Sequence, residues 1–196
     1  MNRTFKAVVI GVSSGGLEAL KTLIPALRAD LRAPVIVVQH LSPQADSYLI
    51  TRLNEISALT VKEAEDKEIL QAGVVYVAPP DYHLLVESDG SLSLSVDPKV
   101  NFSRPSVDVL FESASDAFAD SLAGVILTGA NQDGARGLAR IKRRGGLAVV
   151  QSPESAQADT MPKAALESTS ADHVLHLREI APFLNNLIGP SHDSNH

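Results

Sequence analysis

The sequence predicts an α/β fold: a three-layer, doubly wound and mainly parallel sheet with an antiparallel hairpin at one edge. Residues 7–10 and 35–38 are unbroken apolar runs of Ala, Val and Ile, and strands that are apolar on both faces are typical of a buried parallel sheet. Between these runs, leucine and isoleucine residues recur with the helical period over residues 17–27. A strand, a helix and a second strand in this order form a βαβ unit, which favours parallel pairing.

The middle of the chain breaks this alternation. Residues 84–87 and 92–96 are two strand-like runs separated by a turn that contains Asp89 and Gly90. An Asp-Gly pair between two such runs favours a β-hairpin. We therefore expect an antiparallel edge on an otherwise parallel sheet.

The other elements are predicted from apolar runs, turn residues and helix-start signals. Pro34 opens the second strand, Pro79 and Pro80 stop the fourth strand, and Ser106 precedes an apolar helical face and can cap that helix. We expect helices over residues 46–57, from residue 106, over 134–144 and over 179–187, and further strands over 59–62, 74–78, 124–128, 147–151 and 173–177.

Composition narrows the class of protein. The 196 residues are 44% hydrophobic, which is enough for one compact domain over residues 1–188, followed by a disordered tail over residues 189–196. Cysteine is absent, so a thiolate nucleophile and a cysteine-ligated metal site are excluded. The net charge of −6 argues against a nucleic-acid partner. No apolar run has the length of a membrane span or the form of a signal peptide, so we expect a cytoplasmic protein without membrane insertion.

Three polar residues stand where predicted strands run out: Ser13, His40 and Asp133. The carboxyl ends of the strands are the functional edge of a parallel sheet, so these side chains should meet there. A serine, a histidine and an aspartate together suggest a nucleophile, its base and the residue that orients the base, which is an acyl-transfer signature. Each residue also has an ordinary alternative: a small turn residue, a surface histidine and a helix cap.

The first strand-to-helix junction, Gly11 to Gly16, is open to three interpretations. A glycine-rich turn before a helix can bind a dinucleotide, but Ser13 replaces the second glycine of that fingerprint, and Gln39 and His40 stand where an acidic ribose ligand is expected. The junction also matches the G-x-S-x-G nucleophile elbow. In α/β-hydrolases, however, the histidine follows the acid along the chain. This chain can therefore share the chemistry of the α/β-hydrolases, but it does not share their fold family.

The third interpretation rests on motifs that extend along most of the chain. They are IGVSSGG from residue 10, VQHLSP from 38, AED from 64, VAPPDYH from 77, RPSVD from 104, ILTGANQDG from 126 and DTMP from 159. In this order they resemble the catalytic domain of the CheB-type chemotaxis protein-glutamate methylesterases. The resemblance implies a serine hydrolase of bacterial signal transduction that demethylates glutamate methyl esters of chemoreceptors and, in many members, deamidates glutamines.

The resemblance also implies a role for each site residue. Ser13 would be the nucleophile, His40 its base and Asp133 the buried acid that orients the base, while the backbone N–H groups of Ser14 and Ala130 would bind the oxyanion. The substrates would be methylated or amidated cytoplasmic helices of chemoreceptors, and no cofactor or metal is required. The familiar pattern has threonine in place of Ser14 and methionine in place of Ala130. Because both positions act through the backbone, the two donors can survive these changes.

Family members usually carry an N-terminal receiver domain, whereas here the catalytic domain begins at once. We therefore expect a stand-alone esterase or a domain cut from a longer protein, with a separate receiver or signalling partner. The alternative is a catalytically silent partner-binding module in bacterial signalling. His83 could line the pocket or serve a structural role in its loop, and the remaining histidines lack convincing metal-ligand spacing.

Overall fold

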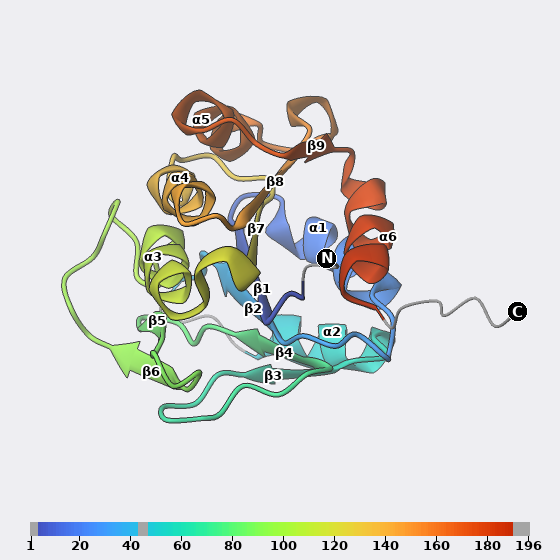
Figure 1. Ribbon diagram of the computed structural model, residues 1–196, viewed down its shortest axis with the longest axis vertical. Helices are drawn as coiled ribbons and strands as arrows, with labels where there is room; N and C mark the ends of the chain where they lie inside the picture. The colour runs from blue at the N-terminus through green and yellow to red at the C-terminus, as the bar shows by residue number, and fades with distance from the viewer. Residues whose placement is uncertain (1–3, 43–46, 190–196) are drawn as a thin grey trace, which may run out of the picture.

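A parallel sheet covered by helices on both faces forms the centre of the molecule (Figure 1). The computed structural model describes residues 4–42 and 47–189. Residue 46, at the start of a predicted helix, and residues 190–196 of the predicted tail lie outside the described residues. The strands of the sheet are β1 (Ala7–Val12), β2 (Val35–Gln39), β3 (Thr60–Glu63), β4 (Val74–Val77), β7 (Leu122–Ile126), β8 (Leu147–Gln151) and β9 (His173–Leu175).

These seven strands lie in the order β3-β4-β2-β1-β7-β8-β9, and every neighbouring pair is parallel. From β1 the chain passes to β2, then to β3 at the edge and back to β4 between them, and it later places β7 on the other side of β1. The direction of winding therefore reverses between β1 and β7. In doubly wound sheets, ligands bind at the carboxyl ends of the strands beside such a switch point.

Helices cover the sheet in two layers (Figure 1). One layer contains α1 (Gly16–Leu23), α2 (Tyr48–Ile56) and α6 (Leu177–Ile188), and the other contains α3 (Val107–Phe118), α4 (Ala135–Arg143) and α5 (Thr160–Ser168). Short 3-10 helices occupy Ile24–Ala26, Ala119–Ser121 and Pro153–Ser155. Within residues 4–42 and 47–189, no helix has both the length and the apolar character needed to cross a bilayer. The predicted three-layer α/β class is confirmed.

Strand β1 shows how the sequence builds both layers at once. Val8 and Ile10 belong to the apolar cluster beneath α1, α2 and α6, whereas Ala7 and Val9 belong to the cluster beneath α3, α4 and α5. Every residue of the strand is buried. Successive side chains of a strand point to opposite faces, so a strand buried on both faces has to be continuously apolar.

The predicted hairpin is present and forms a small sheet of its own. Strands β5 (His83–Val86) and β6 (Leu92–Ser95) pair with each other in antiparallel register, and Leu92 also exchanges backbone hydrogen bonds with Lys67 and Glu68. The hairpin lies beside α3 (Figure 1), where the Val86 N–H donates to Ser113 Oγ at 3.1 Å. The edges of the main sheet are formed by β3 and β9. The hairpin thus extends the apolar layer beneath α3 without adding strands to the main sheet.

Two helices near the C-terminus differ from the sequence prediction. Helix α5 is not predicted, because Pro162 interrupts its pattern; the proline stands in the first turn, where the missing N–H group has no intrahelical role. Helix α6 begins at Leu177, before the predicted start at residue 179. His176 caps it, and the Glu179 carboxylate accepts the His176 N–H at 2.8 Å. This capping box uses histidine where serine or threonine is usual.

Candidate active site

The ends of three adjacent strands bring Ser13, His40 and Asp133 together. Ser13 follows β1, His40 follows β2, and Asp133 lies in the loop after β7; β1 is paired with both of the other strands. The Ser13 N–H donates to Thr128 O at 2.9 Å, and the His40 N–H donates to Val12 O at 3.1 Å. Hydrogen bonds between the strands therefore continue into the loops and fix the main chain of both residues.

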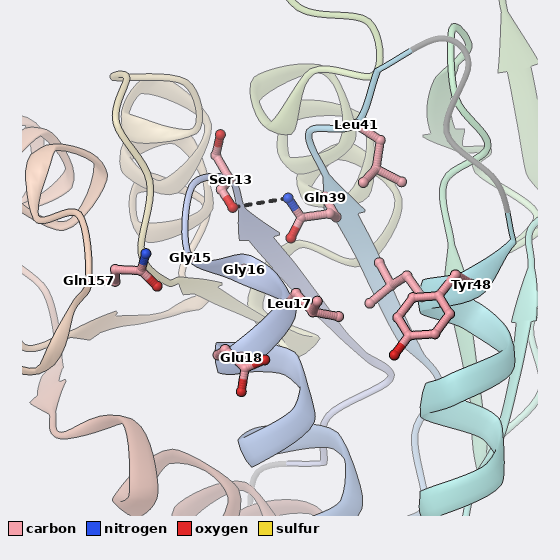
Figure 2. A pocket seen from close by; sticks show the side chains of 10 residues that line it. Ser13, Gly15, Gly16, Leu17, Glu18, Gln39, Leu41, Tyr48 and Gln157 are labelled. Atoms are coloured by element: carbon pink, nitrogen blue, oxygen red, sulfur yellow. Dashed lines mark hydrogen bonds between the residues drawn. The ribbon is translucent and has the colours of Figure 1, made fainter.

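The turn after β1 holds the backbone of Ser13 from several sides. The Ser13 carbonyl accepts the Gly16 N–H at 2.8 Å and the Gln39 side-chain amide at 3.0 Å (Figure 2). Gly15 has a φ of 80°, a left-handed conformation that residues with a Cβ rarely adopt. The chain can therefore turn sharply from strand to helix, which leaves the Ser13 hydroxyl at the mouth of a cleft.

His40 and Asp133 form a buried pair. His40 Nε2 lies 2.8 Å from Asp133 Oδ2, and the exposed fractions of the two side chains are 13% and 0%. Asp133 also accepts hydrogen bonds at the start of α3, from Ser106 Oγ at 2.8 Å, from the Val107 N–H at 2.7 Å and from the Asp108 N–H at 3.1 Å. A carboxylate at a helix N-terminus is stabilised by the free N–H groups and by the helix dipole.

This arrangement corrects two details of the expected helix caps. Ser106 occupies the N-cap position of α3, but its hydroxyl donates to Asp133 and makes no cap hydrogen bond. The first N–H groups of α3 instead donate to Asp133, which is distant in the sequence. Asp133 does not cap α4, whose N-cap residue is Gly134. The Asp133 carboxylate therefore accepts the first N–H groups of α3 and not those of α4, the helix that follows it in the sequence.

Burial and hydrogen bonding act in opposite directions on Asp133. Burial, the largest influence, raises the pKa of this carboxyl, but hydrogen bonds from His40, Asn101 and the start of α3 together outweigh it, so the pKa is lowered. An ionised carboxylate can only accept hydrogen bonds. His40 must therefore present a proton on Nε2 toward Asp133, and in the neutral ring the lone pair is left on Nδ1.

The atom that contacts this lone pair is the amide nitrogen of Asn131. Asn131 Nδ2 lies 3.2 Å from His40 Nδ1 and 3.3 Å from Ser13 Oγ. The side-chain oxygen of Asn131 accepts the Asp133 N–H at 2.9 Å. Ser13 Oγ and His40 Nδ1 are thus neighbours of a single nitrogen atom, which is held by the same loop that carries Asp133.

A second buried carboxyl, Asp108, lies beside Asp133. It accepts the Gly137 N–H at 2.7 Å and the Asn101 side-chain amide at 2.8 Å, and the same Asn101 nitrogen donates to Asp133 Oδ1 at 2.8 Å. Burial, and to a smaller extent the charge of Asp133, raise the pKa of Asp108. Asn101 therefore stabilises the ionised forms of two adjacent carboxyl groups.

Replacing Asn101 with glycine tests this electrostatic balance. Glycine accepts the φ of 51° at this position but removes the amide, so we expect the pKa of Asp133 to rise toward its unfolded-state value. A carboxyl with a lowered folded-state pKa stabilises the fold above its unfolded-state pKa and loses that contribution as the pH falls through the folded-state pKa. Asn101→Gly should therefore lower the free energy of unfolding by about 1–3 kcal/mol near neutral pH, and by progressively less as the pH falls below about 4 and through the folded-state pKa of Asp133.

Urea denaturation of both proteins over this pH range measures the difference. A difference that stays constant with pH would show that Asn101 acts only through its backbone conformation. The pH dependence of the difference contains its own control. Any effect of glycine on the entropy of the unfolded chain is independent of pH, so it shifts the difference equally at every pH.

Clefts adjoin the three residues on several sides. A cleft of about 440 Å³ is lined by Ser13, Gln39, Leu17, Leu41 and Tyr48 among others (Figure 2). A second, of about 640 Å³, lies beyond Asn131 and Ala130, and a small third, of about 100 Å³, adjoins His40. Phe102 borders the second and the third, and its side chain is 98% exposed.

The predicted oxyanion donors lie at the exposed rim of this site. Ser14 and Ala130 are both exposed, and within residues 4–42 and 47–189 neither backbone N–H group donates a hydrogen bond. Both N–H groups are therefore free to bind an oxygen from outside the chain. Their role as oxyanion donors stays a prediction.

His83, for which two roles remained open, is held inside the fold. It is 1% exposed, its Nδ1 accepts the Ser106 N–H at 3.2 Å, and its Nε2 lies 3.0 Å from Pro98 O. These contacts attach the hairpin and the following loop to the start of α3. Across the described part of the chain, no group of three or more histidine and carboxylate side chains is placed to hold a metal ion.

A comparison with models of protein families identifies the family of this chain. Residues 8–184 match the family model described as CheB methylesterase. The chain belongs to the CheB methylesterase family. The crystal structure of the Thermotoga maritima CheB methylesterase catalytic domain is similar, with a TM-score of 0.90 at 38% identity, and the match covers 94% of this chain and 100% of that one. The family predicted from the sequence motifs is confirmed.

Relatives of this CheB-family chain differ in length. A relative from Leptospira interrogans is 52% identical over 177 residues, which is 90% of this chain and 92% of the relative. Relatives named protein-glutamate methylesterase/protein-glutamine glutaminase include one from Symbiobacterium thermophilum, 41% identical over 94% of this chain, and one from Archaeoglobus fulgidus, 44% identical over 89%. The match covers 51% of the length of each of these two.

Sequence reasoning missed three residues of this site. Asn101, Phe102 and Asn131 all lie in loops, where no periodicity marks a buried or functional side chain. The signals for Asn131 were its place in the motif from residue 126 and its position two residues before Asp133, where an asparagine side chain often accepts a backbone N–H group. Phe102 is conspicuous as an aromatic residue in a polar loop, but its exposure is visible only in the structure.

Proposed function

We propose that this CheB-family chain is a protein-glutamate methylesterase that acts through Ser13, His40 and Asp133. The observation that carries the proposal is the placement of His40: one ring nitrogen contacts the ionised Asp133, and the other contacts the Asn131 amide nitrogen, which also contacts Ser13 Oγ. The hydroxyl, the imidazole and the buried carboxylate are the three groups that nucleophilic catalysis by serine uses. The names of the relatives supply the class of substrate.

In the acylation step, Ser13 Oγ attacks the carbonyl carbon of the glutamyl ester while its proton passes to His40 Nδ1. Asp133 stabilises the resulting imidazolium through Nε2. The tetrahedral intermediate then collapses: the bond to the methoxy group breaks, the methoxy oxygen takes the proton from Nδ1, and methanol leaves. The glutamyl side chain remains as an ester on Ser13.

Deacylation repeats these steps with water. His40 Nδ1 takes a proton from water as the oxygen attacks the acyl carbon, and Ser13 Oγ recovers that proton as it leaves, so glutamate is released. In both halves the carbonyl oxygen becomes negatively charged. The backbone N–H groups of Ser14 and Ala130 are the donors proposed for this oxygen; one such donor contributes about 10²- to 10³-fold to turnover in enzymes of this chemistry.

The same site can act on a primary amide. If a glutamine side chain replaces the ester, ammonia takes the place of methanol as the leaving group, and the acyl-enzyme is identical. The proposed substrates are therefore the methylated or amidated cytoplasmic helices of chemoreceptors, in keeping with the two activities that the relatives are named for. The reaction needs no metal and no cofactor.

Incubation with a methylated chemoreceptor fragment tests the proposal directly. We expect release of methanol at a rate proportional to the concentration of the chain, with one new carboxylate for each methanol. Binding of the fragment without release of methanol would instead favour a catalytically silent partner-binding module. A separate receiver or signalling partner, if added, should change the rate without being required for it.

Phe102 is proposed to contact the substrate. Because its side chain is 98% exposed, Phe102→Ala should leave the free energy of unfolding unchanged, yet it removes apolar surface beside the site. We expect KM to rise about 5- to 30-fold with little change in kcat, since partial burial of an aromatic ring contributes about 1–2 kcal/mol. Val174→Ala, an exposed apolar residue on β9, is the matched control. Equal effects of the two substitutions would remove Phe102 from the binding surface.

A further inference from the structure

The side chain of Asn131 is fixed so that its nitrogen, and not its oxygen, faces the reactive atoms. Its oxygen accepts the Asp133 N–H at 2.9 Å, which leaves Nδ2 directed at His40 Nδ1 and Ser13 Oγ. Exchanging the amide oxygen and nitrogen would place two donors against each other at Asp133. The hydrogen-bond network therefore determines the orientation of the amide.

Counting protons shows what this contact does to the base. An amide nitrogen has two hydrogens and no available lone pair, so it donates to both Nδ1 and Oγ. The neutral imidazole has a single lone pair on Nδ1, and Asn131 occupies it. Within the described residues, no hydrogen bond joins Ser13 Oγ directly to His40. In this arrangement the Ser13 proton has no path to its base.

We propose that Asn131 is a positioning residue that latches the resting site, and this inference rests on the roles proposed above for Ser13 and His40. The latch keeps His40 in the Nε2–H tautomer and must release Nδ1 before Ser13 can be deprotonated. Release needs a new acceptor for the amide hydrogens. The cleft of about 640 Å³ beyond Asn131 can admit a substrate carbonyl group, whose oxygen is such an acceptor.

The latch predicts opposite effects for two substitutions at this position. Asn131→Ala removes both hydrogens and lets the Ser13 hydroxyl donate to Nδ1. Asn131→Asp keeps the size and the oxygen that accepts the Asp133 N–H, but it presents an acceptor to Nδ1 and thereby favours a proton on that nitrogen. A residue that serves only the structure of the loop would show the reverse order, with aspartate better tolerated than alanine.

Labelling with a fluorophosphonate measures the reactivity of Ser13 without any chemoreceptor. In this reaction a bond forms between Ser13 Oγ and phosphorus, fluoride leaves, and the Ser13 proton passes to His40. We expect Asn131→Ala to be labelled about 3- to 10-fold faster than the wild type, the range for losing one net hydrogen bond. Asn131→Asp should be labelled at least about tenfold more slowly. Labelling of Asn131→Ala at or below the wild-type rate would overturn the latch.

Nitrogen-15 NMR of the histidine rings provides a second readout that does not depend on reactivity. In the folded wild type with neutral His40, Nε2 should carry the proton and Nδ1 should show the shift of a hydrogen-bond acceptor. The Nδ1 signal should move in Asn131→Ala, whose hydrogen-bond partner differs, and Nδ1 should become protonated in Asn131→Asp. An Nδ1 signal that is unchanged in both folded variants would also overturn the latch.

The two readouts separate failure of the latch from failure of the proposed function. If the wild type, Asn131→Ala and Ser13→Ala are all unlabelled, Ser13 is not a nucleophile and the proposed function fails. The Nδ1 signal then still decides whether Asn131 holds the ring. If the wild type is labelled and Ser13→Ala is not, the proposed nucleophile stands, and the order of the Asn131 variants alone decides the latch.

Discussion

Ser13→Ala should reduce the turnover of a methylated chemoreceptor fragment by about four to six orders of magnitude. The substitution removes the atom that is proposed to form the acyl-enzyme, whereas the backbone contacts of Ser13 with Thr128, Gly16 and Gln39 do not involve the hydroxyl. The fold should therefore be unchanged, with a free energy of unfolding within about 1 kcal/mol of the wild type, since only the hydrogen bond from Asn131 to the hydroxyl is lost. Methanol release, measured together with urea denaturation, checks both parts of this expectation.

Ser14→Ala is the matched control for this experiment. Ser14 is the adjacent residue and is exposed, and its proposed contribution comes from the backbone N–H group, which alanine retains. We expect at most a few-fold change in turnover. If Ser14→Ala abolished methanol release while Ser13→Ala retained it, the nucleophile would be the adjacent serine.

Asp133→Asn should have the second-largest effect and should act on both catalysis and stability. Five groups donate hydrogen bonds to this carboxylate, from His40, Asn101, Ser106, Val107 and Asp108. An asparagine amide places its own hydrogens against some of these donors in either orientation. We expect kcat to fall about 10³- to 10⁴-fold and the free energy of unfolding to fall by about 2–4 kcal/mol.

Ser106→Ala separates the two parts of this prediction. It removes a single donor from Asp133 and leaves the carboxylate in contact with His40. We expect a loss of stability of about 1 kcal/mol and a turnover within about tenfold of the wild type. A turnover of Asp133→Asn as high as that of Ser106→Ala would contradict a role for the Asp133 charge in orienting His40.

The sequence predicted most of the fold because strands that are buried on both faces of a sheet appear in the sequence as continuous apolar runs. Strand β1 has to be apolar at every position, and its run is visible without any alignment. The position of the hairpin could not be predicted in the same way. The Asp89–Gly90 turn indicates that two strands pair with each other, but it contains no information on what lies next to them. That β5 and β6 lie beside α3 depends on packing between distant segments.

For the candidate site, the sequence predicted which residues meet but not the contacts that orient their side chains. Ser13, His40 and Asp133 follow strands that pair with β1 or are β1 itself, so topology alone brings them to one edge. The contacts that orient these side chains come from loops and from the start of α3. Asn101 and Asn131 contribute through single side-chain hydrogen bonds, which have no periodic signature in a sequence. Their catalytic consequences stay predictions.

The attachment of Asp133 to the start of α3 also affects how activity arises during folding. His40 and Asp133 are 93 residues apart in the sequence, and Asp133 is separated from Ser106 by 27. Contacts between distant residues form late, because the entropy of loop closure opposes them until much of the chain is in place. A growing or partly collapsed chain can contain the Ser13 turn, but it lacks an oriented base. Hydrolytic activity should therefore return after helical content when the denatured protein is refolded.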